Sequence, residues 1–172
     1  MQIEPDTKDW TWVLEQPCPE CGFVAAELDP ADVAGRVLDT LPRWDAVLER
    51  DDAARRPDPG TWSVAEYACH VRDVFGVFEA RVRLMLEQVD PVFDNWDQDA
   101  TAVSDDYASQ APSTVAPQLV AAGRSIAQTF AGVPDDAWGR TGRRSNGSSF
   151  TVRTLAQYFL HDVVHHLHDV RG

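Results

Sequence analysis

The chain has 172 residues, of which 44% are hydrophobic, and this is enough for one domain with a sizeable core. Its formal net charge of −13 argues against a nucleic-acid-binding surface and against binding to anionic membranes, because both require clustered positive charge. The sequence shows no basic-then-apolar leader and no long apolar run, so we expect a cytoplasmic protein.

Residues 1–28 show weak periodicity and are predicted to form an irregular N-terminal arm. This arm contains the segment Cys-Pro-Glu-Cys-Gly at residues 18–22. A pair of cysteines at this spacing can be half of a zinc site, a redox pair or a tight turn with two small apolar side chains. Since the chain has three cysteines and no second such pair, the turn is the simplest interpretation, and the other two stay open.

The first predicted helix begins at residues 29–30, where Asp29 can cap it and Pro30 suits the first helical position. A helical stripe of apolar residues follows, at Val33, Val37, Leu41, Trp44 and Leu48. Pro42 falls inside this stripe and is expected to kink the helix. The helical pattern ends at residues 51–52, and residues 56–60 are predicted to form a loop.

The second predicted helix has the clearest start in the chain. Ser63 and Glu66 have the spacing of a capping box, and Trp62 and Tyr67 stand at the two hydrophobic-staple positions. A buried stripe follows, at Tyr67, Val71, Val74, Phe78, Val82 and Met85. His70 sits on the shoulder of that stripe.

Two further helices are predicted, from about residue 113 to Gly132 and from about Thr151 to the C-terminus. Residues 90–112 form a long connection, which is uncommon unless it covers a site or crosses a bundle. No credible strand pair is visible. We therefore predict an all-α fold, a four-helix bundle with a long crossover between the second and third helices. Residues 1–172 are expected to form a single domain, with the arm at 1–28 and the bundle at 29–172.

The last helix carries four of the five histidines of the chain, namely His161, His165, His166 and His168. His161 and His165 are one turn apart and point the same way, and His168 joins their stripe. At about 100° per residue, this stripe lies opposite the main apolar face of the helix. This position argues against histidines buried in the core. The histidines of the stripe are then either metal ligands or part of a solvated polar face. His166 lies apart from the stripe and is interpreted as a structural histidine.

The remaining histidine, His70, could complete a metal site if its helix neighbours the last one. Zinc in catalytic sites usually has three protein ligands and an open position for water. His70, His161 and His165 are accordingly the predicted metal ligands. His168 would close the coordination sphere if it also bound the metal, and that alternative stays open.

Two stretches resemble motifs of the DinB/YfiT-like superfamily. Residues 60–66 leading to His70 resemble its second-helix motif, and residues 150–152 leading through 161–166 resemble its fourth-helix motif. The motifs occur in the family's order and span the chain from about residue 29. The resemblance implies a four-helix bundle with a divalent metal, zinc or nickel, held by three histidines, which match His70, His161 and His165.

The resemblance also implies an activity. Relatives with known activity include thiol-dependent transferases and isomerases. We therefore expect a metal-dependent thiol S-transferase or isomerase that acts on a small molecule, with mycothiol or another low-molecular-weight thiol as cosubstrate. A metal-water hydrolase and a non-catalytic metal-binding or stress-response protein are the alternatives. A homodimer stays open.

Six further side chains are assigned around the predicted metal. The candidate substrate-binding residues are Tyr158, by helical facing, Trp96 and Asp97, on the long connection, and Arg144, which could pair with an anionic group of a thiol. Asp162 and Asp169 flank the histidine stripe and could orient the ligand rings, although ordinary solvated acids are as simple an interpretation. Cys18 and Cys21 are expected not to be required for this metal, because a disulfide is disfavoured in a reducing cytoplasm.

Overall fold

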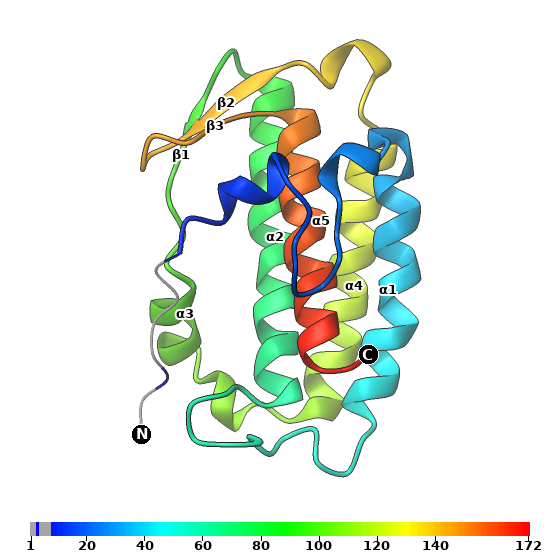
Figure 1. Cartoon of the computed structure of the whole chain (residues 1–172), viewed down its shortest axis with the longest axis vertical. Coiled ribbons are helices and arrows are strands. Elements are labelled where there is room, and N and C mark those ends of the chain that lie inside the picture. The colour runs from blue at the N-terminus through cyan, green and yellow to red at the C-terminus, as the bar shows by residue number, and fades with distance from the viewer. Residues whose placement is uncertain (1–2, 4–7) are drawn as a thin grey trace.

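The computed structural model describes residue 3 and residues 8–172, and in it four long helices lie side by side (Figure 1). These helices are α1 (Val33–Leu48), α2 (Val64–Glu87), α4 (Pro112–Ala131) and α5 (Val152–Asp169). Both α1 and α2 pack against α4 and α5. The predicted four-helix bundle with a long middle crossover is confirmed. Within the described residues, no helix has the length and apolarity needed to cross a membrane.

Capping boxes begin the two helices that carry the histidines. Ser63 Oγ accepts a hydrogen bond from the Glu66 amide (3.2 Å), and Glu66 Oε2 accepts one from the Ser63 amide (2.9 Å). At α5 the pair is Thr151 and Thr154, whose hydroxyls accept from each other's amides at 3.1 and 2.9 Å. Each box satisfies two backbone donors that would otherwise lack partners, and so fixes where the helix begins.

The start of α1 is later than expected. Asp29 caps a short 3-10 turn, η3 (Pro30–Asp32), by accepting a hydrogen bond from the Ala31 amide, and the α-helix begins only at Val33. The predicted apolar stripe of this helix is buried throughout, at Val33, Val37, Leu41, Trp44 and Leu48.

A small three-stranded sheet was not predicted. Its strands are β1 (Val92–Phe93), β2 (Thr141–Arg144) and β3 (Ser149–Thr151), and β2 pairs in parallel with β1 and antiparallel with β3. The sheet ties the connection after α2 to the connection before α5. Strands of two to four residues are too short to show an alternating pattern, so sequence periodicity does not reveal them.

The long crossover also contains structure of its own. A short helix, α3 (Gln98–Ser104), begins where Asp97 Oδ1 accepts a hydrogen bond from the Ala100 amide at 2.9 Å. The 3-10 turn η4 (Tyr107–Ser109) follows, and another, η5 (Asp135–Ala137), lies after α4. This crossover covers one side of the bundle beside α2 (Figure 1).

The N-terminal arm is packed onto the bundle. Its 3-10 turns η1 (Trp10–Leu14) and η2 (Ala25–Glu27) both contact α5, and the arm runs across α5 in Figure 1. Its buried residues are Val13, Cys18, Phe23, Ala25 and Leu28. Gln157 Nε2 donates a hydrogen bond to the Ala25 carbonyl at 2.7 Å. The arm therefore covers a face of α5 that the other helices leave open. Part of the predicted arm, residues 1–2 and 4–7, lies outside the described residues.

Candidate metal centres

Two neighbouring stripes of α5 carry two separate groups of metal-ligand side chains. His161 and His165 share one stripe, and Asp162 and His166 share the next, about 100° further around the helix. The first stripe meets the cysteines of the arm, and the second meets His70 of α2. Within each group, one ligand atom from every member lies within 4.8 Å of the others.

The histidine–carboxylate group consists of His70, Asp162 and His166. Asp162 Oδ1 lies 3.2 Å from His70 Nε2 and 3.8 Å from His166 Nε2. His70 is fully buried, whereas Asp162 and His166 are partly exposed, so the group is open to solvent on one side. The buried Nδ1 of His70 has no hydrogen-bond partner among the described residues.

Electrostatics keep the carboxylate of this group ionised. Burial alone would raise the pKa of Asp162, but the imidazoles of His70 and then His166 lower that pKa to about 2. His166 is oriented by Asp169, whose Oδ2 lies 2.9 Å from His166 Nδ1. Because Asp169 contacts Nδ1 of His166, the other ring nitrogen of His166, Nε2, points toward Asp162. A carboxylate behind a ligating histidine is a common arrangement in metal sites.

The cysteine–histidine group consists of Cys18, Cys21, His161 and His165. Cys18 Sγ lies 3.7 Å from His165 Nδ1. Cys18, His161 and His165 are buried, and Cys21 is half-buried. Burial, with a smaller contribution from His165, lowers the pKa of His161 to about 4, so this imidazole is neutral and able to bind a metal. Burial raises the pKa of the Cys21 thiol to about 11, and nearby Cys18 adds to the effect.

The predicted set of three histidines does not form one group. His161 and His165 lie together, but His70 faces Asp162 and His166 instead. The reason is helix geometry: α2 approaches α5 on the stripe of residues 162 and 166, about 100° away from the stripe of 161 and 165.

The sequence contained a signal for each missed partner. Asp162 and His166 have the same four-residue spacing as His161 and His165, so this helix carries two stripes of candidate ligands. Cys18 and Cys21 lie on the predicted turn, and this turn brings both sulfur atoms to His161 and His165. His168 is exposed and belongs to neither group.

All four predicted substrate-binding residues line one pocket of about 1100 Å³, namely Tyr158, Trp96, Asp97 and Arg144. The Trp96 ring stacks on the His70 ring, with centroids 5.4 Å apart and planes at 12°, and Trp96 Nε1 donates a hydrogen bond to Thr101. Trp62 also lines the pocket, and the centroid of its ring lies 5.7 Å from the centroid of the His70 ring. Two indoles thus separate the pocket from His70.

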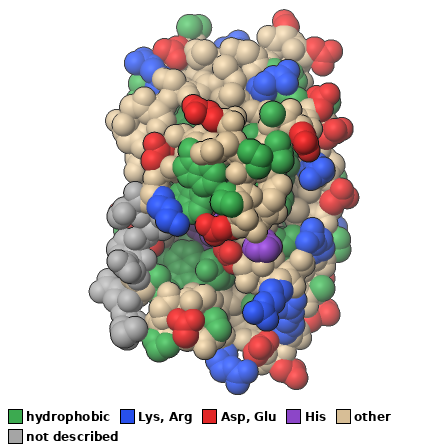
Figure 2. Space-filling view, viewed as in Figure 1, with side chains coloured by type: hydrophobic (Ala, Val, Ile, Leu, Met, Phe, Trp, Pro, Cys, Tyr) green, Lys and Arg blue, Asp and Glu red, His purple; other side chains and the backbone are tan. Residues whose placement is uncertain are grey.

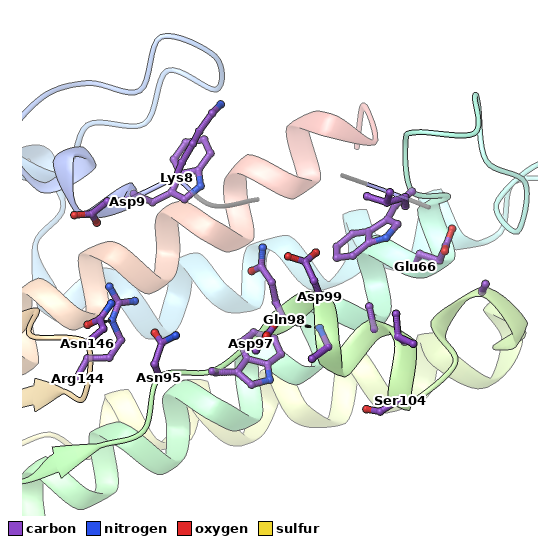
Figure 3. A pocket seen from close by; sticks show the side chains of 18 of the residues that line it. Lys8, Asp9, Glu66, Asn95, Asp97, Gln98, Asp99, Ser104, Arg144 and Asn146 are labelled. Atoms are coloured by element: carbon purple, nitrogen blue, oxygen red, sulfur yellow. Dashed lines mark hydrogen bonds between the residues drawn. The ribbon is translucent and has the colours of Figure 1, made fainter. Parts of the chain in front are cut away.

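The pocket lies between the N-terminal arm and α3 (Figure 3). Lys8 and Asp9 of the arm lie on one side of it. Arg144 and Asn146 lie near one end, and Glu66 lies near the other. Figure 2 shows a hollow on this face, with hydrophobic side chains inside it and histidine and acidic side chains beside it.

Comparisons with known proteins agree with this fold. A family model described as the DinB superfamily matches residues 39–170, well over half of the chain. A comparison with curated proteins finds no match. Among solved structures, the chain is similar to YfiT from Bacillus subtilis, with a TM-score of 0.67, 17% identity and coverage of 97% of this chain and 89% of that chain. YfiT is described as a probable metal-dependent hydrolase with an unusual four-helix bundle topology. At this identity the likeness shows a shared fold.

Proposed function

The chain belongs to the DinB superfamily, and we propose that it is a metal-dependent hydrolase whose divalent metal is held by His70, Asp162 and His166. The observation that carries this proposal is the convergence of two imidazoles and an ionised carboxylate in a group that is partly open to solvent, next to two indoles that line the large pocket. The description of YfiT as a probable metal-dependent hydrolase supports the same class of reaction.

The donor set fits a catalytic metal. Two histidines and one carboxylate are the ligands of several catalytic zinc sites, which keep a further position for water or substrate. Nitrogen and oxygen donors suit zinc and also nickel. Asp162 and His166 are partly exposed, so a ligand from solvent can reach the open side of the group.

The side chains around this group have separable tasks. A divalent metal bound there would polarise a substrate oxygen and lower the pKa of a water molecule toward neutrality. Asp169 holds the ring of His166 in place through Nδ1. Trp96 and Trp62 lie between His70 and the pocket.

The pocket favours a small polar substrate. Arg56 and Arg144 contribute positive charge to its wall, and Glu66 and Asp97 contribute negative charge. Arg144 donates hydrogen bonds to Asn146 (2.9 Å) and to Ser148 (3.0 Å), which fix its guanidinium at the edge of the pocket. The volume is about that of the larger known small-molecule sites.

Thiol transfer is the competing use of the same metal. The sequence resemblance implied mycothiol or another low-molecular-weight thiol as cosubstrate, and the test must separate that reaction from hydrolysis. We would purify the full chain without a His tag, remove metal with a chelator and reload it with zinc or nickel. Nitrophenyl esters, phosphate esters and amides would be assayed with and without mycothiol.

The expected result is hydrolysis without a thiol, lost on chelation and restored by metal. His166→Ala should lower kcat/KM about a hundredfold or more, since it removes a ligand, whereas His168→Ala, at an exposed position of the same helix, should not. Full activity in His166→Ala would refute the ligand assignment. Turnover that appears only when a thiol is added would identify a thiol transferase.

A further inference from the structure

We propose that Cys18, Cys21, His161 and His165 hold a second metal ion, a structural zinc that fastens the N-terminal arm to α5. The proposal concerns a different set of ligands from the hydrolase centre and does not depend on that function. It assigns a role to the cysteine pair, for which the family resemblance gave none.

The turn that carries the cysteines is built to a fixed shape. The Gly22 amide donates to the Cys18 carbonyl, and the Cys18 amide donates to the Phe23 carbonyl, each at 2.9 Å. Gly22 has a φ of +75°, a conformation that other residues adopt only with strain. These contacts close the turn around residues 18–23 and bring both sulfur atoms within reach of α5.

The ligands from α5 complete a known type of zinc site. His161 and His165 lie one helical turn apart, so the chain offers Cys-x-x-Cys from a turn and His-x-x-x-His from a helix, the spacing of structural zinc sites with two cysteines and two histidines. His165 has Nδ1 toward Cys18 Sγ, at 3.7 Å. Its Nε2 lies 3.6 Å from a carboxylate oxygen of Glu20 and 3.8 Å from one of Asp169, which can orient the ring.

A second observation points to a ligand at this place. The Nε2 atom of His161 is buried and has no hydrogen-bond partner among the described residues, which is rare for an interior polar atom. Trp10 covers both histidines, with ring centroids 5.6 Å from His161 and 5.1 Å from His165. The Phe23 ring packs against the His161 ring, with centroids 5.7 Å apart. The aromatic rings close the site, as expected for a structural metal.

Charge and distance are both compatible with zinc. Binding Zn²⁺ converts two thiols to thiolates and releases two protons, so two neutral imidazoles and two thiolates give an uncharged complex. An uncharged complex can be buried at little cost. With bonds of about 2.0–2.3 Å, ligand atoms in a tetrahedral site lie about 3.3–3.8 Å apart. The present atoms lie within 4.8 Å of one another, so a shift of about 1 Å closes the site.

A disulfide between Cys18 and Cys21 is the alternative. It would use both sulfur atoms but would give His161 and His165 no role and would leave His161 Nε2 without a partner. All three cysteines of the chain are free thiols in the structure.

The test is cobalt substitution of the full chain, purified without a tag under reducing conditions. Wild-type protein should show a sulfur-to-cobalt charge-transfer band that saturates at one equivalent. The Cys18→Ser, Cys21→Ser double variant should lose this band. Cys69→Ser is the matched control, because Cys69 is buried on α2 outside the group, and it should keep the band. His166→Ala should also keep it, which separates this proposal from the hydrolase metal.

Three results would overturn the proposal. One is a wild-type spectrum without the band at saturating cobalt, a measurement that needs no variant. Another is a band that survives in the double variant, checked for native folding by circular dichroism. The last is a disulfide between Cys18 and Cys21, seen by mass spectrometry in protein isolated under reducing conditions.

Discussion

Glu66 is a buried charge that serves the structure of the pocket wall. Its carboxylate pairs with the Arg56 guanidinium and accepts a hydrogen bond from the Ser63 amide. Burial alone would raise the pKa of Glu66, but the contacts with Arg56 and Ser63 hold it below its ordinary value. Glu66 is therefore ionised at neutral pH and engaged on both sides, which argues against a role in proton transfer although it lines the pocket.

Replacing Glu66 tests this role through pH. A carboxyl whose pKa is lowered by folding stabilises the protein above its unfolded pKa of about 4.3, and this stabilisation is lost as the pH falls through the folded pKa. Glu66→Gln should lower the free energy of unfolding by about 1–3 kcal/mol at pH 7, because it removes the charged partner of Arg56. The loss is limited because Arg56 is partly exposed, so water can solvate its guanidinium in place of the carboxylate.

Urea unfolding at about pH 7 and about pH 3.5 measures this effect, and the difference from wild type should shrink at the lower pH. Glu87→Gln, at the exposed C-terminal end of α2, is the control and should leave the free energy of unfolding unchanged at both pH values. A loss of stability that is equal at the two pH values would refute the ionised pair.

The element that organises both centres is α5. The stripe of Asp162 and His166 faces α2 and the crossover, and the adjacent stripe of His161 and His165 faces the arm. The arm also contributes Lys8, Asp9 and Trp10 to the wall of the pocket. A metal that holds the arm on α5 would thus also shape the pocket, although it lies on the other stripe of the helix.

Hydrogen exchange of the arm should report its metal. Chelation should speed exchange of the amides of Cys18 and Gly22 tenfold or more, because the turn then relies on its own hydrogen bonds and side-chain burial. Amides in the middle of α2 should not change. His166→Ala should keep the chelator-sensitive exchange, and the Cys18→Ser, Cys21→Ser variant should exchange fast from the start. If chelation leaves the exchange rates of the arm amides unchanged in wild-type protein, no metal holds the arm on α5.

At the scale of the whole molecule, the two centres join parts of the chain that are distant in sequence. The histidine–carboxylate group joins α2 to α5, and the cysteine–histidine group joins the arm to α5. Ligands that bind only the folded state stabilise it by mass action. Both metals are therefore expected to raise the thermal midpoint.

Zinc at a hundredfold excess over its Kd should contribute about 2.7 kcal/mol per site. For a chain of this size that corresponds to a rise in Tm of about 5–10 °C for each occupied site. Thermal unfolding followed by circular dichroism, with chelator and with zinc, gives the shift. The Cys18→Ser, Cys21→Ser variant and His166→Ala should each keep about half of it, and a Tm that zinc does not move would count against both centres.

The sequence by itself determined the bundle and the start of its second helix. Apolar stripes at helical spacing and the capping box of Ser63 and Glu66 are local patterns, and the structure confirms them. The family was also recognisable, because its motifs are short and contiguous. The four-residue spacing of His161 and His165 marked that helix as a candidate source of metal ligands.

Only the tertiary structure decided which ligands meet. Asp162 with His166 and His161 with His165 have the same spacing on one helix, and nothing in the spacing says which pair faces α2 and which faces the arm. The three-stranded sheet and the packing of the arm were missed for the same reason, since both depend on contacts between segments far apart in the chain. Local periodicity fixes the faces of a helix, but the rotation of that helix about its axis is fixed by burial against its neighbours, and that rotation separated His70 from the histidines predicted to join it.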